Sequence, residues 1–272
     1  MVIKQNSSYK LPFSKKEIID KYQQGLSCYA IAKMCNCSAS NIFSILKKAN
    51  IQTRSLSQAA TKYTLNHNYF DKIDNEEKAY FLGFLYADGN VTNKKVTLCL
   101  QEKDKHILDC FKNSLQYTGP ITINNKTGNR QTQFKLVITS ELLVKALNIQ
   151  GVYPHKAFNL SFPANLPKNY YNHFIRGYFD GDGCIYIHQN KTDYLISMIG
   201  PKIFLESIQT ILVDSAEVNR TKLYNPKNCK ENGLHTLTYQ GRKNVIKIGD
   251  FLYKNATCFL NRKHSKYLAC YD

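Results

Sequence analysis

The chain has 272 residues, of which 43% are hydrophobic and 21% charged, a composition typical of globular proteins that excludes a wholly disordered chain. Its 37 Lys and Arg outnumber its 20 Asp and Glu, and the formal net charge of +17 favours nucleic acid as a partner over a membrane surface. The longest apolar run, residues 80–87, is much shorter than the roughly 20 residues that span a bilayer. Nine cysteines at irregular spacings predict free thiols and an intracellular, reducing compartment.

The positive charge is concentrated at the two ends of the chain. Residues 1–60 hold nine Lys and Arg against two acidic residues, and residues 220–272 hold eleven against three. The middle of the chain is nearly neutral. We therefore expect a polyanion to contact both ends, with a merely soluble basic protein as the alternative interpretation.

Residues 14–49 have the periodicity of three short helices. Ser14 and Glu17 form the capping-box pattern of the first helix. Residues 25–54 (GLSCYAIAKMCNCSASNIFSILKKANIQTR) resemble the helix-turn-helix of small DNA-binding modules, in which the later helix lies in the major groove. Residues 1–52 are thus predicted to be a small all-α DNA-binding domain, with a bundle that makes protein contacts as the alternative. The resemblance places Ser40, Asn41 and Ser44 at base edges and Lys47, Lys48 and Arg54 on phosphates.

After a predicted linker, residues 53–68, the chain contains two similar halves, residues 69–166 and 167–272. They begin with AYFLGFLYADG (79–89) and HFIRGYFDGDG (173–183), each an apolar helix with a central glycine and a terminal Asp-Gly. Each continues with two strands, an amphipathic helix, two strands and a helix. The pattern predicts an α+β fold with two pseudo-symmetric halves.

The repeated glycine and aspartate indicate how the two halves meet. A glycine inside a helix costs about 0.5–1 kcal/mol, so Gly83 and Gly177 are expected at a close contact between the two helices. Such packing brings Asp88 and Asp182 together at the helix ends. Two carboxylates there repel each other and favour a divalent cation between them; oxygen ligands beside a phosphate point to Mg²⁺, for which Mn²⁺ can substitute.

These two motifs resemble those of single-chain LAGLIDADG (DOD-type) homing endonucleases, over about residues 69–268. The resemblance implies two αββαββα halves whose sheets form a saddle over the DNA major groove. It also implies that Asp88 and Asp182 are the metal ligands, and the backbone carbonyls of Ala87 and Gly181 stand beside them. The first motif departs from the family at Tyr86, where the second has Asp180, and the second departs at Arg176.

Basic and amide residues near the motifs are candidates for ordering water or stabilising a transition state. Lys103 stands where the family often has its catalytic lysine, and Gln101 lies on the same strand face. The second half offers Lys202, and Lys263 lies in a tail segment that resembles one common in these enzymes. Ordinary phosphate contacts or solvated surface are the alternative roles of these lysines.

Strand residues that face away from the helices are the candidates for reading the target. In the first half Val96, Leu98 and Leu100 point inward, which leaves polar neighbours on the opposite face. The predicted DNA contacts are Lys95, Thr97, Gln133, Lys135 and Thr139 in the first half, and Tyr186, His188, Ser197, Arg220, Lys222, Thr238, Gln240 and Arg242 in the second.

Two functions fit this pattern. The first is a monomeric, Mg²⁺-dependent endonuclease that makes a site-specific double-strand break in a long DNA target and serves intron homing. The second is a non-catalytic binder on the same scaffold, either a DNA-binding regulator or an RNA-splicing maturase with intron RNA as its partner.

Overall fold

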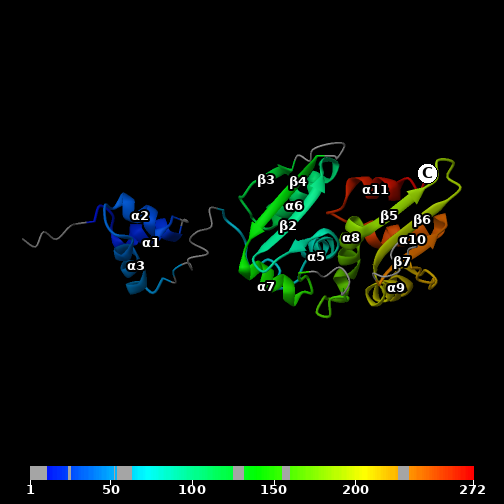
Figure 1. Cartoon of the computed structure of the whole chain (residues 1–272), viewed down its shortest axis with the longest axis horizontal. Helices are drawn as coiled ribbons and strands as arrows, with labels where there is room; N and C mark the ends of the chain where they lie inside the picture. Colours follow the sequence, from blue (N-terminus) through cyan, green and yellow to red (C-terminus); the bar gives the residue numbers. More distant parts are fainter. Residues whose placement is uncertain are drawn as a thin grey trace, which may run out of the picture. The chain divides into compact units, whose positions relative to one another are not determined.

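The computed structural model describes residues 11–23, 26–51, 53, 63–124, 132–154, 160–225 and 233–272. The chain divides into two compact units, Met1–Lys62 and Tyr63–Asp272 (Figure 1). In the described ranges, no helix is long and apolar enough to cross a membrane. The cysteines within these ranges are free thiols.

The smaller unit contains the three predicted helices, α1 (Lys15–Gln23), α2 (Cys28–Met34) and α3 (Ala39–Lys48). The Ser14 backbone N–H donates to Glu17 Oε2 at 2.8 Å and the Glu17 N–H donates back to Ser14 Oγ at 3.3 Å, so the predicted capping box forms. Ser27 and Ser38 cap the next two helices. The core of this unit comprises Ile18, Tyr22, Ile31, Ala32, Cys35, Ile42 and Leu46.

The larger unit consists of two halves. The first has the predicted order of elements; in the described part of the second, the predicted first strand of the second hairpin is reduced to an isolated bridge at Tyr224. The first half contains α5 (Glu76–Asp88), β1 (Asn90–Val91), β2 (Lys95–Gln101), the 3-10 turn η1 (Glu102–Asp104), α6 (Lys105–Ser114), β3 (Ile121–Asn124), β4 (Gln133–Thr139) and α7 (Glu141–Ile149). The second contains η3 (Lys168–Tyr170), α8 (Tyr171–Asp182), β5 (Gly183–Ile187), β6 (Tyr194–Pro201), α9 (Lys202–Ala216), β7 (Leu234–Gln240), α10 (Arg242–Tyr253) and an additional helix, α11 (Asn261–Leu268).

Each half has one antiparallel sheet. The strand orders are β1-β2-β4-β3 and β5-β6-β7, and a bridge between Tyr224 and Thr236 stands where the first sheet has β3. Burial alternates along β2, so Val96, Leu98 and Leu100 face the helices as predicted and their neighbours face outward. The helices α5 and α8 pack against each other between the two sheets (Figure 1).

The segment that precedes α5 packs on the larger unit from Thr64 onward. The Thr64 N–H donates to Thr118 Oγ1 at 2.9 Å, and the Asn66 N–H donates to the Leu115 carbonyl at 2.8 Å. Leu65 packs against the main core. The later part of the stretch predicted as a linker is therefore tied to the end of α6.

Candidate active site and nucleic-acid interface

The two glycines of the repeat lie at the crossing of α5 and α8. A β-carbon on Gly83 would lie 1.9 Å from the carbonyl oxygen of Phe174, and one on Gly177 would lie 1.9 Å from that of Tyr80. Neither distance leaves room for a side chain, so the two backbones are in direct contact. The close packing that the repeated glycines predicted is confirmed.

This crossing brings the two terminal aspartates to one place. A β-carbon on Gly181, the residue before Asp182, would lie 2.3 Å from the β-carbon of Ala87 and 3.3 Å from Asp88 Oδ2. The Tyr178 hydroxyl lies near enough to both carboxylates to be influenced by their charge. Burial raises its pKa, and the charges of Asp182 and Asp88 raise the pKa further. The carboxylates of the two halves thus converge beside the C-terminal ends of their helices.

The donor set at this point consists of oxygens. Two carboxylates meet beside helix ends that carry partial negative charge, an arrangement that a hard divalent cation stabilises. Within the described ranges, no group of three or more His, Cys, Asp and Glu side chains could hold a metal ion. A cation between Asp88 and Asp182 would therefore need further oxygen ligands from backbone carbonyls, water or a bound phosphate.

The predicted supporting residues of the first half lie where β2 ends. Gln101 is half-buried opposite Gln133, and Lys103 is exposed on η1. In the second half, Lys202 begins α9, and its ammonium lies 3.7 Å from the carboxylate of Glu206 one turn later. Lys202 thus forms an ion pair within its own helix, and because this pair is exposed it contributes little to stability.

Lys263 differs most from expectation. We expected its side chain at a scissile phosphate, but it is only 3% exposed. Its ammonium donates to the carbonyls of Phe179, Asp180 and Gly183 at 2.5, 2.8 and 2.6 Å. Burial lowers the pKa of Lys263 to about 8, against the charge of Asp180. All of its donor hydrogens are directed at the C-terminal end of α8, where a cation neutralises the helix dipole.

The outer faces of the sheets carry most of the residues predicted to read DNA. Lys95 pairs with Thr139, Cys99 with Lys135 and Gln101 with Gln133, so these side chains and Thr97 share the face opposite the core. In the second sheet the same face carries Tyr186, Ser197, Thr238 and Gln240.

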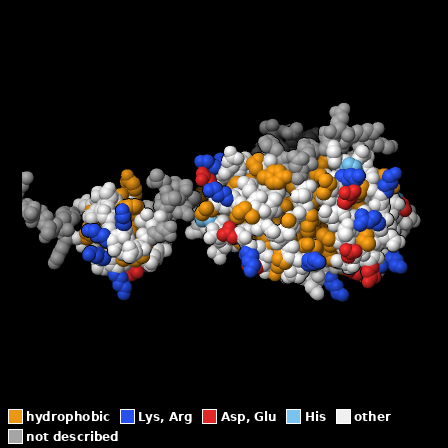
Figure 2. Space-filling view, turned by 90° about the horizontal axis from the view of Figure 1, so that it is seen from below, with side chains coloured by type: hydrophobic (Ala, Val, Ile, Leu, Met, Phe, Trp, Pro, Cys, Tyr) orange, Lys and Arg blue, Asp and Glu red, His pale blue; other side chains and the backbone are white. Residues whose placement is uncertain are grey.

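Other predicted contacts are engaged within the chain. Arg220 donates to Gln209 Oε1 and Thr210 Oγ1 on α9, at 3.2 and 2.9 Å. Arg242 donates to the carbonyls of Cys270 and Tyr271 near the end of the chain. His188 accepts from the Asn190 N–H in the turn after β5, Lys222 is exposed, and Arg54 lies outside the described residues. On the face shown in Figure 2, Lys and Arg side chains are scattered among acidic and uncharged ones.

The third helix of the smaller unit exposes mostly polar side chains, together with Phe43, which is 47% exposed. Ile42 and Leu46 face its core, and the opposite side of α3 is open to solvent. That this helix enters a DNA groove stays a prediction. The exposed residues predicted to contact DNA are Ser40, Asn41, Ser44, Lys47 and Lys48.

Comparison with known families identifies the second half. The family model described as a LAGLIDADG-like domain matches residues 169–250, which run from just before α8 into α10. The chain contains a LAGLIDADG-like domain. The residues matched include the glycine and the aspartate of the second motif.

Two curated proteins of Methanocaldococcus jannaschii are similar to parts of the chain. A probable translation initiation factor IF-2 is 26% identical over an aligned length of 211 residues, and the match covers 71% of this chain and 17% of that protein. A reverse gyrase is 30% identical over 120 residues, which make up 44% of this chain and 7% of that protein. The chain thus spans less than a fifth of the length of either relative.

Solved structures with a similar arrangement include LAGLIDADG proteins bound to DNA. The homing endonuclease I-LtrWI bound to target DNA is 14% identical, with 76% of this chain and 89% of that chain covered and a TM-score of 0.45. I-WcaI bound to its DNA recognition sequence is 14% identical, with 80% and 93% covered and a TM-score of 0.44. The N-terminal LAGLIDADG domain of DUF199/WhiA is 14% identical, with 74% and 94% covered and a TM-score of 0.42. At such low identities these likenesses carry no functional meaning.

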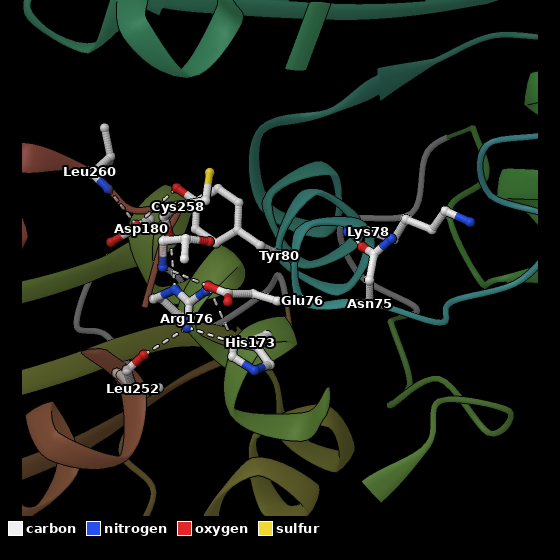
Figure 3. Close-up of polar contacts among 11 residues, drawn as sticks. Asn75, Glu76, Lys78, Tyr80, His173, Arg176, Asp180, Leu252, Cys258 and Leu260 are labelled. Carbon is white, nitrogen blue, oxygen red and sulfur yellow. Dashed lines mark hydrogen bonds and ion pairs between the residues drawn. The ribbon is translucent and has the colours of Figure 1, made fainter. Parts of the chain in front are cut away.

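The LAGLIDADG-like domain contains a buried cation that the sequence marked only as a departure from the family pattern (Figure 3). Arg176 is completely buried in α8 and forms an ion pair with Glu76 of α5, with Nη2 2.7 Å from Oε1. It also donates to the carbonyls of Leu252 and Cys258, each at 2.9 Å. The arginine thus joins α8 to the first half and to the segment after α10.

One turn later, Asp180 of the same domain is also completely buried. It accepts hydrogen bonds from the hydroxyls of Tyr253 and Tyr80, at 2.7 and 2.9 Å, and from the Leu260 N–H at 2.7 Å. Burial raises the pKa of Asp180, and these donors together with the Lys263 ammonium oppose that rise. Charged residues four positions apart inside an otherwise apolar helix are the signal by which the sequence marks this network.

Proposed function

We propose that the chain is a site-specific endonuclease that hydrolyses both strands of double-stranded DNA. The observation that carries the proposal is the convergence of Asp88 and Asp182 at the ends of two helices whose backbones touch at Gly83 and Gly177. A protein that only binds DNA gains nothing from two carboxylates placed together, because they repel the phosphates it must approach.

In this proposal Asp88 and Asp182 hold Mg²⁺, with Mn²⁺ able to substitute, beside the carbonyls of Ala87 and Gly181. A divalent metal held there would neutralise phosphate charge and lower the pKa of a water bound to it. Lys103 stabilises negative charge that develops on a phosphate, and Gln101 orients water in the first half. The exposed position of Lys103 on η1 leaves its ammonium accessible to a bound strand.

Recognition in this proposal uses the outer faces of both sheets. Pairs such as Lys95 and Thr139, or Ser197 and Thr238, project donors and acceptors from the side opposite the core. Lys and Arg in such positions neutralise phosphates, while amides and hydroxyls read base edges. The exposed side of α3 extends the contact beyond the saddle.

The experiment selects a binding site first and tests cleavage second. The full chain is used to enrich duplexes from a randomised DNA library, and the enriched duplex is then incubated with MgCl₂. We expect a double-strand cut that requires the metal. Asp88→Asn and Asp182→Asn should each reduce cleavage at least a hundredfold while binding in Ca²⁺ changes by less than threefold.

Asp214→Asn is the matched control, because it makes the same change of charge on the exposed surface of α9. It should cut like the wild type. Full Mg²⁺-dependent cleavage by both aspartate variants would overturn the proposal. Specific binding with no cut under any divalent metal would instead support the non-catalytic regulator, and preferential binding of structured intron RNA would support the maturase.

A further inference from the structure

The segment between α10 and α11, with the first turn of α11, contacts the two halves alternately. We call residues 257–263 the strap. Three of its residues bond to the first half and three to the second. To the first half, the Thr257 N–H donates to Glu76 at 2.8 Å, the Phe259 carbonyl lies 3.2 Å from His106 Nε2, and Arg262 pairs with Asp104. To the second half, the Cys258 carbonyl accepts from Arg176, the Leu260 N–H donates to Asp180, and the Lys263 ammonium donates to carbonyls at the end of α8.

The contact of Arg262 with Asp104 has an unusual feature. Asp104 occupies the N-cap position of α6, where an aspartate usually accepts from its own helix, but its carboxylate makes no such bond. Both carboxylate oxygens instead lie close to Arg262 Nε, at 3.1 and 3.2 Å. Asp104 is only 6% exposed, so Arg262 neutralises a buried charge that lies 158 positions earlier in the chain.

Asp104 ends η1, the short turn that also contains Lys103. Hydrogen bonds in a 3-10 turn have poorer geometry than those of an α-helix, so a contact from outside the turn adds to its stability. Holding Asp104 therefore holds the backbone of Lys103. The next residue of the strap, Lys263, holds the carbonyls at the end of α8, which Asp182 terminates. Adjacent residues of α11 are thus anchored to the candidate catalytic elements of both halves.

We infer that Arg262 is a positioning residue of the first half's cleavage centre, supplied by the second half. This inference rests on the proposed function. Arg262 sets where Lys103 and Gln101 stand relative to Asp88, and it contacts no substrate itself. The strap thereby couples the two halves, so that cleavage by the first half's centre depends on the docked tail of the second half.

The first measurement needs no DNA. Hydrogen–deuterium exchange is followed in peptides that cover residues 101–108, in the wild type and in Arg262→Gln. We expect exchange there to accelerate at least tenfold, while peptides from α7 keep their rates. Unchanged exchange over 101–108 would overturn the anchoring role, whether or not the chain cuts DNA.

The second measurement follows each strand of the enriched duplex separately. Arg262→Gln should slow one strand at least tenfold more than the other, so nicked product accumulates, while binding in Ca²⁺ is retained. Arg262→Lys should restore part of the rate. Lys266→Gln is the matched control, because Lys266 lies on the same helix and donates at 3.1 Å to the Ile185 carbonyl of its own half.

The outcomes separate the two proposals. Equal slowing of both strands by Arg262→Gln, or slowing that Lys266→Gln reproduces, would overturn the positioning role while leaving the endonuclease intact. A wild-type chain that binds its duplex and never cuts it would overturn the endonuclease and the catalytic part of this inference. The exchange result would then still decide whether Arg262 anchors the turn.

Discussion

The helices α5 and α8 occupy equivalent places in the two halves, yet their interiors differ. Both have a glycine at the crossing and an aspartate at the end. Where α5 has Leu82 and Tyr86, α8 has Arg176 and Asp180, and all four side chains are buried. The apolar interior of α5 packs by shape, whereas α8 carries a buried charge of each sign.

The difference follows from what each helix must hold. The Tyr86 hydroxyl donates to the Gln150 carbonyl just after α7, a single bond to the end of the first half. Arg176 and Asp180 instead bind backbone groups of Leu252, Cys258 and Leu260, which lead into α11. The second half has an additional helix to anchor, and buried backbone groups require hydrogen-bond partners. Asymmetry in a repeat thus appears where one copy carries an extra element.

The largest expected loss of stability comes from replacing the buried charge of α8, Arg176. Arg176→Met leaves the carbonyls of Leu252 and Cys258 without their donor and Glu76 without its cation, so we expect a loss of about 3–5 kcal/mol. Leu82→Met, at the equivalent position of α5, conserves volume and should cost less than about 1.5 kcal/mol. Urea unfolding followed by circular dichroism measures both. Equal losses of unfolding free energy in the two variants would show that α8, like α5, is stabilised mainly by close packing.

The glycine contact should instead behave symmetrically. Gly83→Ala and Gly177→Ala each insert a methyl 1.9 Å from a carbonyl oxygen of the facing helix, which forces the backbones apart. We expect each to lose about 3 kcal/mol, within 1 kcal/mol of the other. Thermal or urea denaturation is the measurement. A neutral effect at one glycine alone would contradict the reciprocal crossing.

A smaller effect distinguishes the two residues one turn from the helix ends. Asp180→Asn weakens three hydrogen bonds and places amide hydrogens near their donors, so we expect a loss of about 2–3 kcal/mol. Tyr86→Phe removes one neutral hydrogen bond and should cost about 1 kcal/mol. Urea midpoints of the two variants decide the order. A costlier Tyr86→Phe would place the stronger polar anchor in the first half.

The last effect is a pH dependence that arises in the second half. Because the pKa of Lys263 is lowered to about 8 from its ordinary 10.5, the folded chain loses this proton before the unfolded chain does. Its contribution to stability therefore rises between pH 8 and 10.5, with a limiting slope of about 1.4 kcal/mol per pH unit. Lys263→Met should flatten the curve of unfolding free energy against pH by this amount. Lys145→Met, on the exposed side of α7, should keep the wild-type slope.

Several features of the fold and the site follow from local sequence. The capping box of Ser14 and Glu17 joins residues three positions apart, so its pattern is readable without the fold. The alternation of β2 identified its inner and outer faces because the side-chain period of a strand is two. The duplicated motif located the glycine crossing and the paired aspartates. A glycine destabilises a helix, so a glycine repeated in both copies indicates a close contact between them.

Partners far apart in the chain were decided only by the tertiary structure. Nothing near Lys263 in sequence indicates that its ammonium binds carbonyls about 80 positions earlier, and nothing near Asp104 indicates Arg262. Arg220 and Arg242 are of a residue type that commonly contacts DNA, yet both donate hydrogen bonds to acceptors within the chain. The reason is physical: a charged side chain pairs with whichever acceptor the packed chain places within hydrogen-bond reach, and that geometry is set by tertiary packing. Sequence periodicity determined the repeated scaffold and its pair of carboxylates, whereas packing determined which basic residues support that scaffold and which remain on its surface.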